Sequence, residues 1–215
     1  MYDAVVFDND GVLTELTDRA VLRGAVRETF AGFGVDPDDG DVETMLSGVT
    51  VDALRRICGR YDLHPEEFWY RRDTNSSAAQ RRAIRAGEKP LYDDVAGVRE
   101  LDLPLGIVSS NQQATVDCIV EHFGLGDRFE VCYGRQPTLE HVRKKKPEPY
   151  FLERALADLA VDDALYVGDS ETDVIAAREA GLDAAFVRRP HRRDYDLSVE
   201  PTYEIDGLDA LADVV

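Results

Sequence analysis

Two aspartates, Asp8 and Asp10, stand one residue apart directly after a short apolar segment, residues 4–7. An unbroken apolar run of this length is typical of a strand that is buried on both faces. Side chains alternate along a strand, so the two carboxylates lie on the same side. Two carboxylates this close do not both stay ionised cheaply without a cation. Either they hold Mg²⁺, which prefers oxygen ligands, or one keeps a proton and acts as an acid.

A second apolar run, residues 105–108, is followed by Ser109, Ser110 and Asn111. Two hydroxyls and an amide at the start of a helix are suited to bind phosphate oxygens. The alternative for Ser109 is a plain helix cap. For Asn111, two roles are equally open: it positions backbone donors, or it caps the helix.

A third apolar run, residues 164–167, leads to Asp169, with Asp173 four residues further along. Four residues make about one helical turn, so both carboxylates can face the same site. Between the second and third runs stands Lys146, followed by Pro147. The proline disfavours helical backbone at the lysine, so the next helix must begin after it.

Elements that position these residues follow an alternating pattern. Strands are expected at 4–7, 105–108, 164–167, 184–187 and 203–205, with helices at about 112–123, 149–159, 173–180 and 208–214. Strand and helix in alternation predict βαβ units and a doubly wound parallel α/β sheet. Ligands of such sheets bind at the carboxyl ends of the strands, which is where the polar residues stand.

One long segment, residues 16–86, shows no strand pattern. Helices are expected at 18–33, 41–46, 51–61 and 65–85. We therefore expect an all-α cap domain at 16–86, inserted into an α/β core made of residues 1–15 and 87–215.

Four motifs now stand in order along the chain: FDNDGVL, IVSSN, KKPEP and VGDSETD. Their order and element types resemble the haloacid dehalogenase superfamily, in its phosphatase branch. Within that branch the chain is similar to subfamily I hydrolases with a helical C1 cap, of the phosphoglycolate phosphatase and β-phosphoglucomutase type. A doubly wound Rossmann-like core with an inserted helical cap is the fold that the resemblance implies.

The resemblance implies four catalytic roles. Asp8 is the expected nucleophile, forming an aspartyl phosphate. Asp10 is the expected general acid for the leaving alcohol and then the base for water. Ser109 is expected to hydrogen-bond the transferring phosphoryl group, and Lys146 to neutralise charge on the nucleophile and the phosphoryl oxygens.

The resemblance also implies Mg²⁺ as cofactor. Its expected ligands are Asp8, Asp169 and the main-chain carbonyl of Asp10, while Asp173 either completes or orients the site. Phosphate contacts are assigned to Gly11, Ser110 and Asn111, although Gly11 is better explained by the sharp turn after Asp10.

The implied reaction is Mg²⁺-dependent hydrolysis of a small phosphorylated metabolite, with a phosphoglycolate-like compound as the family-level guess. The nearest alternative is a β-phosphoglucomutase-like phosphomutase. Such mutases carry a histidine about ten residues after the second aspartate, where this chain has Ala20. A catalytically silent phospho-ligand-binding regulatory protein is the other alternative, and the intact set of catalytic residues argues against it.

Composition narrows the possible partners. The chain of 215 residues carries 43 acidic and 25 basic residues, a formal net charge of −18. Nucleic acids and anionic membrane surfaces both need a basic face, so neither is an expected partner. With only 4 lysines among the basic residues, the excess of acid and arginine is typical of halophilic proteins, although a GC-rich genome also favours arginine. Three cysteines without a CxxC motif predict neither a disulfide framework nor a zinc site. A cytoplasmic protein is expected, because the sequence shows no signal peptide and no spanning helix. The family resemblance implies a monomer or homodimer.

The remaining distinctive side chains are expected to be structural or solvent-exposed. They are the four histidines (His64, His122, His141 and His191), the aromatic pair Trp69 and Tyr70, and Lys144 with Lys145. Residues 46–54 (LSGVTVDAL) resemble a cap stretch that lies near substrate in the family. Arg55 or Arg56 is a weak candidate there for a contact with an anion.

Overall fold

The computed structural model describes residues 2–46 and 48–215 and contains one parallel six-stranded sheet. Its strands are β1 (Ala4–Phe7), β2 (Leu105–Gln112), β3 (Val131–Arg135), β4 (Ala164–Gly168), β5 (Asp183–Val187) and β6 (Tyr203–Ile205). The order is β3-β2-β1-β4-β5-β6. Strand β1 therefore has β2 and β4 as neighbours, and Phe7 pairs with both Ile107 and Val167. This register brings three predicted strand ends to one edge, and the predicted doubly wound fold is confirmed.

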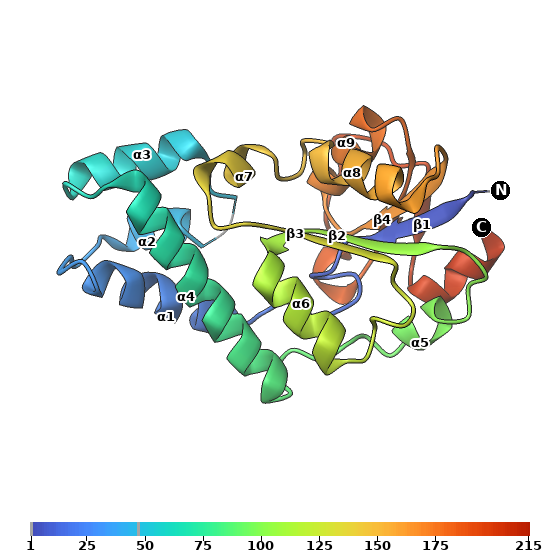
Figure 1. Cartoon of the computed structure of the whole chain (residues 1–215), viewed down its shortest axis with the longest axis horizontal. Coiled ribbons are helices and arrows are strands. Elements are labelled where there is room, and N and C mark those ends of the chain that lie inside the picture. Colours follow the sequence, from blue (N-terminus) through green and yellow to red (C-terminus); the bar gives the residue numbers. More distant parts are fainter. Residues whose placement is uncertain (1, 47) are drawn as a thin grey trace.

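Helices cover both faces of the sheet because the strand side chains alternate. Val5 and Phe7 pack on the face covered by α5 (Val95–Val98) and α6 (Gln113–His122). Ala4 and Val6 pack on the opposite face, under α8 (Tyr150–Leu159) and α9 (Glu171–Glu179). Figure 1 shows α6 below the sheet and α8 and α9 above it. Burial on both faces accounts for the unbroken apolar strands of the sequence.

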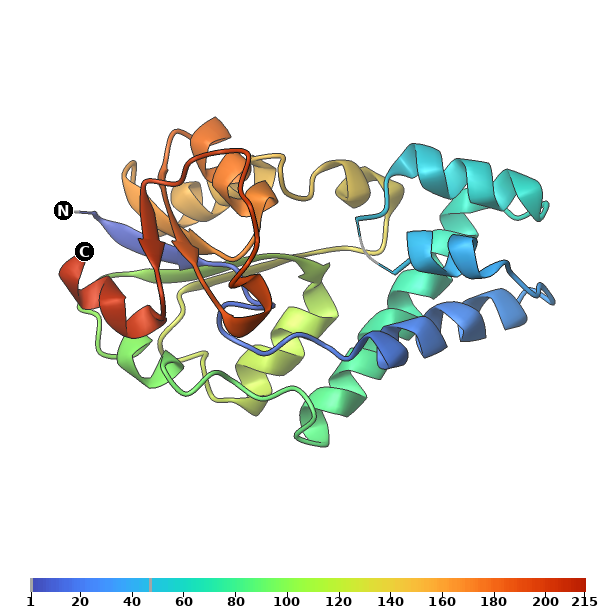
Figure 2. The same cartoon turned by 180° about the vertical axis from the view of Figure 1, so that it is seen from behind.

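Between β1 and β2 the chain forms a group of four helices, called here the helical unit. It consists of α1 (Arg19–Ala31), α2 (Asp39–Thr44), α3 (Val51–Arg60) and α4 (Pro65–Arg85). The unit lies to one side of the sheet, and α4 runs back from it toward α6 (Figures 1 and 2). Together with Leu139 and Val142 from the segment after β3, it buries a separate apolar cluster, with Phe30, Leu54 and Phe68 fully inside. The segments that enter and leave the unit are paired at Thr14 and Leu91.

Local signals explain where these helices begin. The Asp18 carboxylate accepts a hydrogen bond from the Ala20 N–H at 2.7 Å and caps α1. The Thr50 hydroxyl accepts one from the Ala53 N–H at 3.2 Å and caps α3. Helix α4 has Pro65 as its first residue, where the missing proline N–H costs nothing.

Several elements differ from the expectations. Strand β3 was not predicted, because VCYGR is a half-buried edge strand with a glycine inside it. The short helices α5 and α7 (Leu139–Arg143) were also not predicted. The last segment, Leu208–Asp213, is a 3₁₀ helix instead of an α-helix.

The three cysteines, Cys58, Cys118 and Cys132, are all free thiols. Among the described helices, none has the length and apolar character needed to cross a bilayer.

Candidate active site

The carboxyl edge of the sheet carries Asp8 after β1, Ser109 within the end of β2, and Asp169 after β4. All three are almost completely buried. The chain turns sharply behind Asp8, where Gly11 has a φ of +82° and a Cβ built on it would lie 2.4 Å from an oxygen of Asp169. Glycine is therefore required for the turn and for the close approach to Asp169.

Lys146 lies at the centre of this edge. Its Nζ is 2.8 Å from Asp8 Oδ1 and 2.5 Å from Asp173 Oδ1. The same ammonium donates to the Tyr166 hydroxyl at 2.8 Å, and that hydroxyl donates to the Val108 carbonyl at 3.0 Å. Burial alone would lower the pKa of Lys146, but Asp173 and Asp8 together raise it well above its usual value. The lysine is thus a fixed positive charge.

Asp173 uses both carboxylate oxygens inside the protein. One oxygen pairs with Lys146, and the other accepts from the N–H groups of Asp169 and Ser170 at 3.2 and 3.0 Å. The Ser170 hydroxyl also donates to it at 2.5 Å. Asp173 and Ser170 form a reciprocal capping box at the start of α9. This bonding favours the orienting role of Asp173 over direct metal coordination, the alternative left open by the sequence.

A metal site is compatible with the buried carboxylates. Oxygens of Asp8, Asp169 and Asp173 lie within 4.8 Å of one another. Burial raises the pKa of Asp8 to about 7, and the Lys146 ammonium offsets this only in part. Crowded buried carboxylates of this kind favour a hard divalent cation with oxygen ligands. The donor set therefore fits Mg²⁺.

Two side chains that the sequence did not indicate, an imidazole and a guanidinium, contact Asp169. His191 Nε2 lies 2.6 Å from Asp169 Oδ2, and Arg192 Nε donates to the same oxygen at 3.1 Å. The expectation that His191 is only structural or exposed overlooked this contact. A signal was present, because His191 follows strand β5 closely and β5 ends beside β4.

Asp10 points away from the carboxylate group toward Lys89. The two side chains form an ion pair, and Asn111 Nδ2 donates to the other oxygen of Asp10 at 2.7 Å. Lys89 is fully buried and also donates to the Thr17 hydroxyl at 3.1 Å. Burial lowers the pKa of Lys89 to about 7. Lys89 was missed by the sequence interpretation, although a lone lysine in an arginine-rich chain is a usable signal.

The polar residues at the end of β2 have distinct surroundings. Ser109 Oγ accepts from the Asn111 N–H at 3.2 Å, but both residues lie within strand β2 and the N-cap residue of α6 is Gln112, so this contact does not cap the helix. Asn111 also exchanges hydrogen bonds with Gln80 of helix α4, at 2.9 and 3.0 Å. The Ser110 carbonyl accepts from Arg135 Nε at 2.7 Å. The β2 end is therefore held by helix α4 and by strand β3.

A cavity of about 540 Å³ separates this edge from the helical unit. The side chains at the strand ends form one wall, and helix α4 contributes Trp69, Arg72, Ser76 and Gln80 to the other. The carboxyl ends of the central strands point toward the helical unit in Figure 2.

The lining of the cavity shows which of the remaining residues singled out in the sequence lie near the site. Trp69 is buried and lines it, whereas Tyr70 is exposed. Lys144 pairs with Glu140 at the surface, as expected for a solvated basic run. Lys145 instead lines the cavity, so the expectation does not hold for this lysine. Within residues 46–54, Leu46, Gly48 and Val49 line the cavity, while Ser47 lies outside the described residues. The exposed side chains of Arg55 and Arg56 are not part of the lining.

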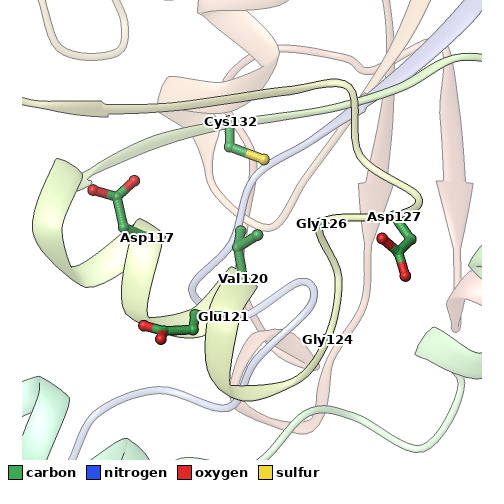
Figure 3. A pocket seen from close by; sticks show the side chains of 7 residues that line it. All are labelled: Asp117, Val120, Glu121, Gly124, Gly126, Asp127 and Cys132. Atoms are coloured by element: carbon green, nitrogen blue, oxygen red, sulfur yellow. The ribbon is translucent and has the colours of Figure 1, made fainter.

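A second hollow lies on the surface beside α6, and its lining contains none of the site residues described above. Figure 3 shows its lining, which comes from helix α6, the following loop and Cys132. Its charged side chains are the acids Asp117, Glu121 and Asp127. Burial raises the pKa of the Cys132 thiol to about 11, so this thiol is no nucleophile at neutral pH.

The chain is similar to several known proteins. Phosphoglycolate phosphatase from Neisseria gonorrhoeae is 28% identical over 187 residues, which is 83% of this chain and 76% of the relative. Tyrosine-protein kinase PtkA from Mycobacterium bovis is 29% identical over 188 residues, 85% of this chain but only 61% of the kinase. The crystal structure of CbbY from Rhodobacter sphaeroides in complex with phosphate superposes with a TM-score of 0.75. At 23% identity it covers 98% of this chain and 96% of CbbY.

The family model for haloacid dehalogenase-like hydrolases matches residues 5–187, which includes all four sequence motifs and the helical unit. The family resemblance of the motifs is thereby confirmed, and the chain belongs to the haloacid dehalogenase-like hydrolases.

Proposed function

We propose that this hydrolase is a Mg²⁺-dependent phosphatase that cleaves a small phosphorylated metabolite through an aspartyl-phosphate intermediate. The observation that carries the proposal is the position of Lys146, whose ammonium lies between Asp8 and Asp173. Asp10 stands two residues after the nucleophile and is held by Lys89 and Asn111. In this proposal Asp8 is the carboxylate that attacks, and Asp10, which also lines the cavity, transfers the proton.

In the first step, an oxygen of Asp8 attacks phosphorus and the bond from phosphorus to the ester oxygen breaks. Asp10 donates a proton to the leaving alkoxide, so the product departs as an alcohol. Lys146 and the Ser109 hydroxyl stabilise the charge on the transferring phosphoryl group.

In the second step, water attacks the phosphorus of the aspartyl phosphate. Asp10, now deprotonated, takes the proton of this water, and the phosphorus–oxygen bond to Asp8 breaks. Inorganic phosphate leaves, and Asp8 returns to its carboxylate form.

Mg²⁺ would be held by Asp8, Asp169 and the main-chain carbonyl of Asp10, with Asp173 fixing the site. When bound, it supplies positive charge that draws phosphate to the carboxylates and offsets charge in the transition state. Gly11, Ser110 and Asn111 are the proposed further contacts of the phosphoryl group.

The helical unit serves as the cap in this proposal, with the cap at 16–86 and the core at 1–15 and 87–215. Four side chains of its helix α4 line the cavity opposite the nucleophile, which supports a role in selecting the leaving group and excluding water. A phosphoglycolate-like substrate is proposed because relatives are named phosphoglycolate phosphatases. Another relative is named a tyrosine-protein kinase, so the names of relatives alone do not fix the reaction. The main support for phosphate-ester hydrolysis is the set of residues in the site.

The test is hydrolysis of p-nitrophenyl phosphate and phosphoglycolate with Mg²⁺ and with excess EDTA. Measurements run from 0.1 M to multimolar KCl, to cover a halophilic protein. We expect turnover only with Mg²⁺, and a fall of at least about a thousandfold in kcat for Asp8→Asn. Asp3→Asn is the matched control, because Asp3 is an exposed carboxylate near the start of the same strand.

The intermediate is tested separately by borohydride reduction during turnover and mass spectrometry of the peptide that contains Asp8. Reduction of an aspartyl phosphate leaves homoserine at this position. Folded wild-type protein without Mg²⁺-dependent turnover would refute the phosphatase, whereas turnover with full activity in Asp8→Asn would refute the proposed nucleophile.

A further inference from the structure

Positive charge gathers at the end of the cavity that faces the helical unit. Arg72 of α4, Arg135 of β3 and Lys145 all line this end. Asp73 pairs with both arginines and is near enough to Lys145 to influence its pKa, and it carries one negative charge against the three positive ones. Among the described lining residues, the acids are Asp8 and Asp10, which belong to the reaction centre at the other end. In a chain with a net charge of −18, this local excess of cations is distinctive.

The two arginines are held rigidly. Arg72 donates to the main-chain carbonyls of Met45 and Leu46, the latter at 2.8 Å. Arg135 donates to Asp73 at 2.7 Å and to the Ser110 carbonyl at 2.7 Å. Both guanidinium groups lie 5.1 Å from the centre of the Trp69 ring. The positive potential at this end is therefore built into the folded protein and needs no rearrangement.

Lys145 has more hydrogen-bonding capacity than its surroundings use. Its ammonium donates to the Val49 carbonyl at 2.6 Å, which accounts for one of three N–H donors. Burial, followed by the neighbouring charges of Arg135 and Arg72, lowers the pKa of Lys145 to about 8, although Asp73 acts in the opposite direction. A second anion would relieve this repulsion and take up the remaining donors.

Two neutral donors stand in the same wall. Trp69 and Ser76 are each at most 2% exposed and line the cavity. Within the described part of the chain, neither Trp69 Nε1 nor Ser76 Oγ has a hydrogen-bond partner. Buried donors of this kind are normally satisfied, and a bound ligand is one way to satisfy them.

We propose that this end of the cavity is a second anion subsite, and that the substrates are small phosphomonoesters with another anionic group, a carboxylate or a second phosphate, at their far end. The reacting phosphate lies at Asp8 and Lys146, while Lys145 receives the second anion with Arg72 and Arg135 behind it. The inference rests on the proposed phosphatase function, because it assumes that the reacting group binds at the strand ends.

The test compares matched ligands that differ only in the second anion. Phosphoglycolate is paired with ethyl phosphate for the carboxylate, and 1,3-propanediol bisphosphate with 3-hydroxypropyl phosphate for the second phosphate. Affinities are measured by calorimetry with excess Mg²⁺, using Asp8→Asn to prevent turnover. We expect at least tenfold tighter binding of one doubly anionic ligand over its partner. The arm with the larger ratio identifies the second group.

The Lys145→Met change, made in the same Asp8→Asn protein, should reduce this affinity ratio to less than threefold. Lys144→Met is the control, because Lys144 is the adjacent lysine and pairs with Glu140 at the surface. It should leave the ratio unchanged. Trp69→Phe, which removes the indole N–H and keeps an aromatic ring, gives a second reading if Lys145→Met fails to fold.

Equal affinities within both ligand pairs, or no binding of either doubly anionic ligand, would overturn the second subsite. So would a ratio that survives in Lys145→Met. Failure of the phosphatase function is read from a different measurement, the absence of wild-type turnover. In that case the same calorimetry is run on the wild-type protein and still decides whether the second anion is recognised.

Discussion

The carboxylate of Asp73 on helix α4 and the guanidinium of Arg135 at the end of strand β3 form a buried, two-pronged ion pair. Asp73 is completely buried, and Gln112 Nε2 donates a further hydrogen bond to it at 2.7 Å. Both Arg135 and Gln112 belong to the sheet, whereas Asp73 belongs to the helical unit. The carboxylate therefore fixes the helical unit to the wall of the cavity.

Replacing Asp73 with Asn should destabilise the protein strongly. The change leaves Arg135 and Arg72 buried without a counter-charge, and breaking one partner of a buried pair costs about 3–5 kcal/mol. The free energy of unfolding is measured by urea titration. Asp39→Asn is the control, since Asp39 pairs with Arg27 at the surface and should change stability by less than about 1 kcal/mol. Equal effects of the two changes would contradict a structural role for Asp73.

Replacing Lys89 with Met should impair proton transfer more than substrate binding. Lys89 and Asn111 hold the two oxygens of Asp10, so loss of the lysine frees the carboxylate to take other orientations. We expect kcat to fall roughly tenfold to a hundredfold, with KM changed by less than about threefold. Lys89→Arg should recover part of kcat if charge at this position orients Asp10. An unchanged kcat in Lys89→Met would show that Asn111 alone positions the general acid.

The sequence predicted that these polar side chains meet at one edge of the sheet, because its signals are local. Each of the strands β1, β2 and β4 is a short apolar run followed at once by polar residues, and parallel strands bring such ends to one edge. Asp8, Ser109 and Asp169 were found in this way. Lys146 was found because it stands directly before a proline in the motif KKPEP.

Contacts between distant segments could not be predicted in the same way. The pairing of Asp73 with Arg135 joins residues 62 positions apart, and Lys89 meets Asp10 across 79 positions. Neither pair has a local pattern, because each depends on how α4 and the segment after it return to the sheet. Lys145 was misjudged for a related reason. A basic run indicates solvent exposure, but here one lysine of the run turns into the cavity while its neighbour Lys144 stays outside.

The titration of Lys145 predicts a pH dependence for ligands with a second anion. Its pKa is lowered to about 8, with Arg72, Arg135 and Asp73 as the charged neighbours. Above that pH the ammonium loses its charge, so affinity for the second anion should weaken between about pH 7 and 9. The measurement is the ratio of Kd values for phosphoglycolate and ethyl phosphate in Asp8→Asn. A ratio independent of pH in this range would show that the lysine charge is not used.

The same lowered pKa has the opposite effect on the stability of the free protein. Between pH 8 and the ordinary lysine pKa of 10.5, the unfolded chain binds a proton that folded Lys145 does not. The contribution of Lys145 to the free energy of unfolding should therefore rise with pH in this window. This contribution is obtained by comparing the free energies of unfolding of wild type and Lys145→Met, measured by urea titration. The difference between the two proteins should change with pH only above about pH 8.

High salt should stabilise the protein, because its net charge of −18 makes the surface repel itself. The Debye length falls from about 10 Å at 0.1 M salt to about 3 Å at 1 M, which suppresses repulsion between exposed carboxylates. We expect the melting temperature and the phosphatase activity to rise from 0.1 M toward multimolar KCl. Thermal unfolding monitored by circular dichroism and initial rates at each concentration measure the two trends.

A charge-reduced variant separates screening from the general effect of salt on apolar burial. Asp36, Asp102 and Glu148 are exposed, and none of the three makes a side-chain ion pair in the described structure. Changing them together to Asn, Asn and Gln should raise the melting temperature in dilute buffer and flatten its dependence on KCl. Salting-out strengthens apolar burial in both proteins alike. Equal slopes of melting temperature against KCl concentration would therefore show that salt stabilises the protein through apolar burial and not through charge screening. A wild-type protein that is fully stable and active in dilute buffer would show that its excess of acids is no adaptation to salt.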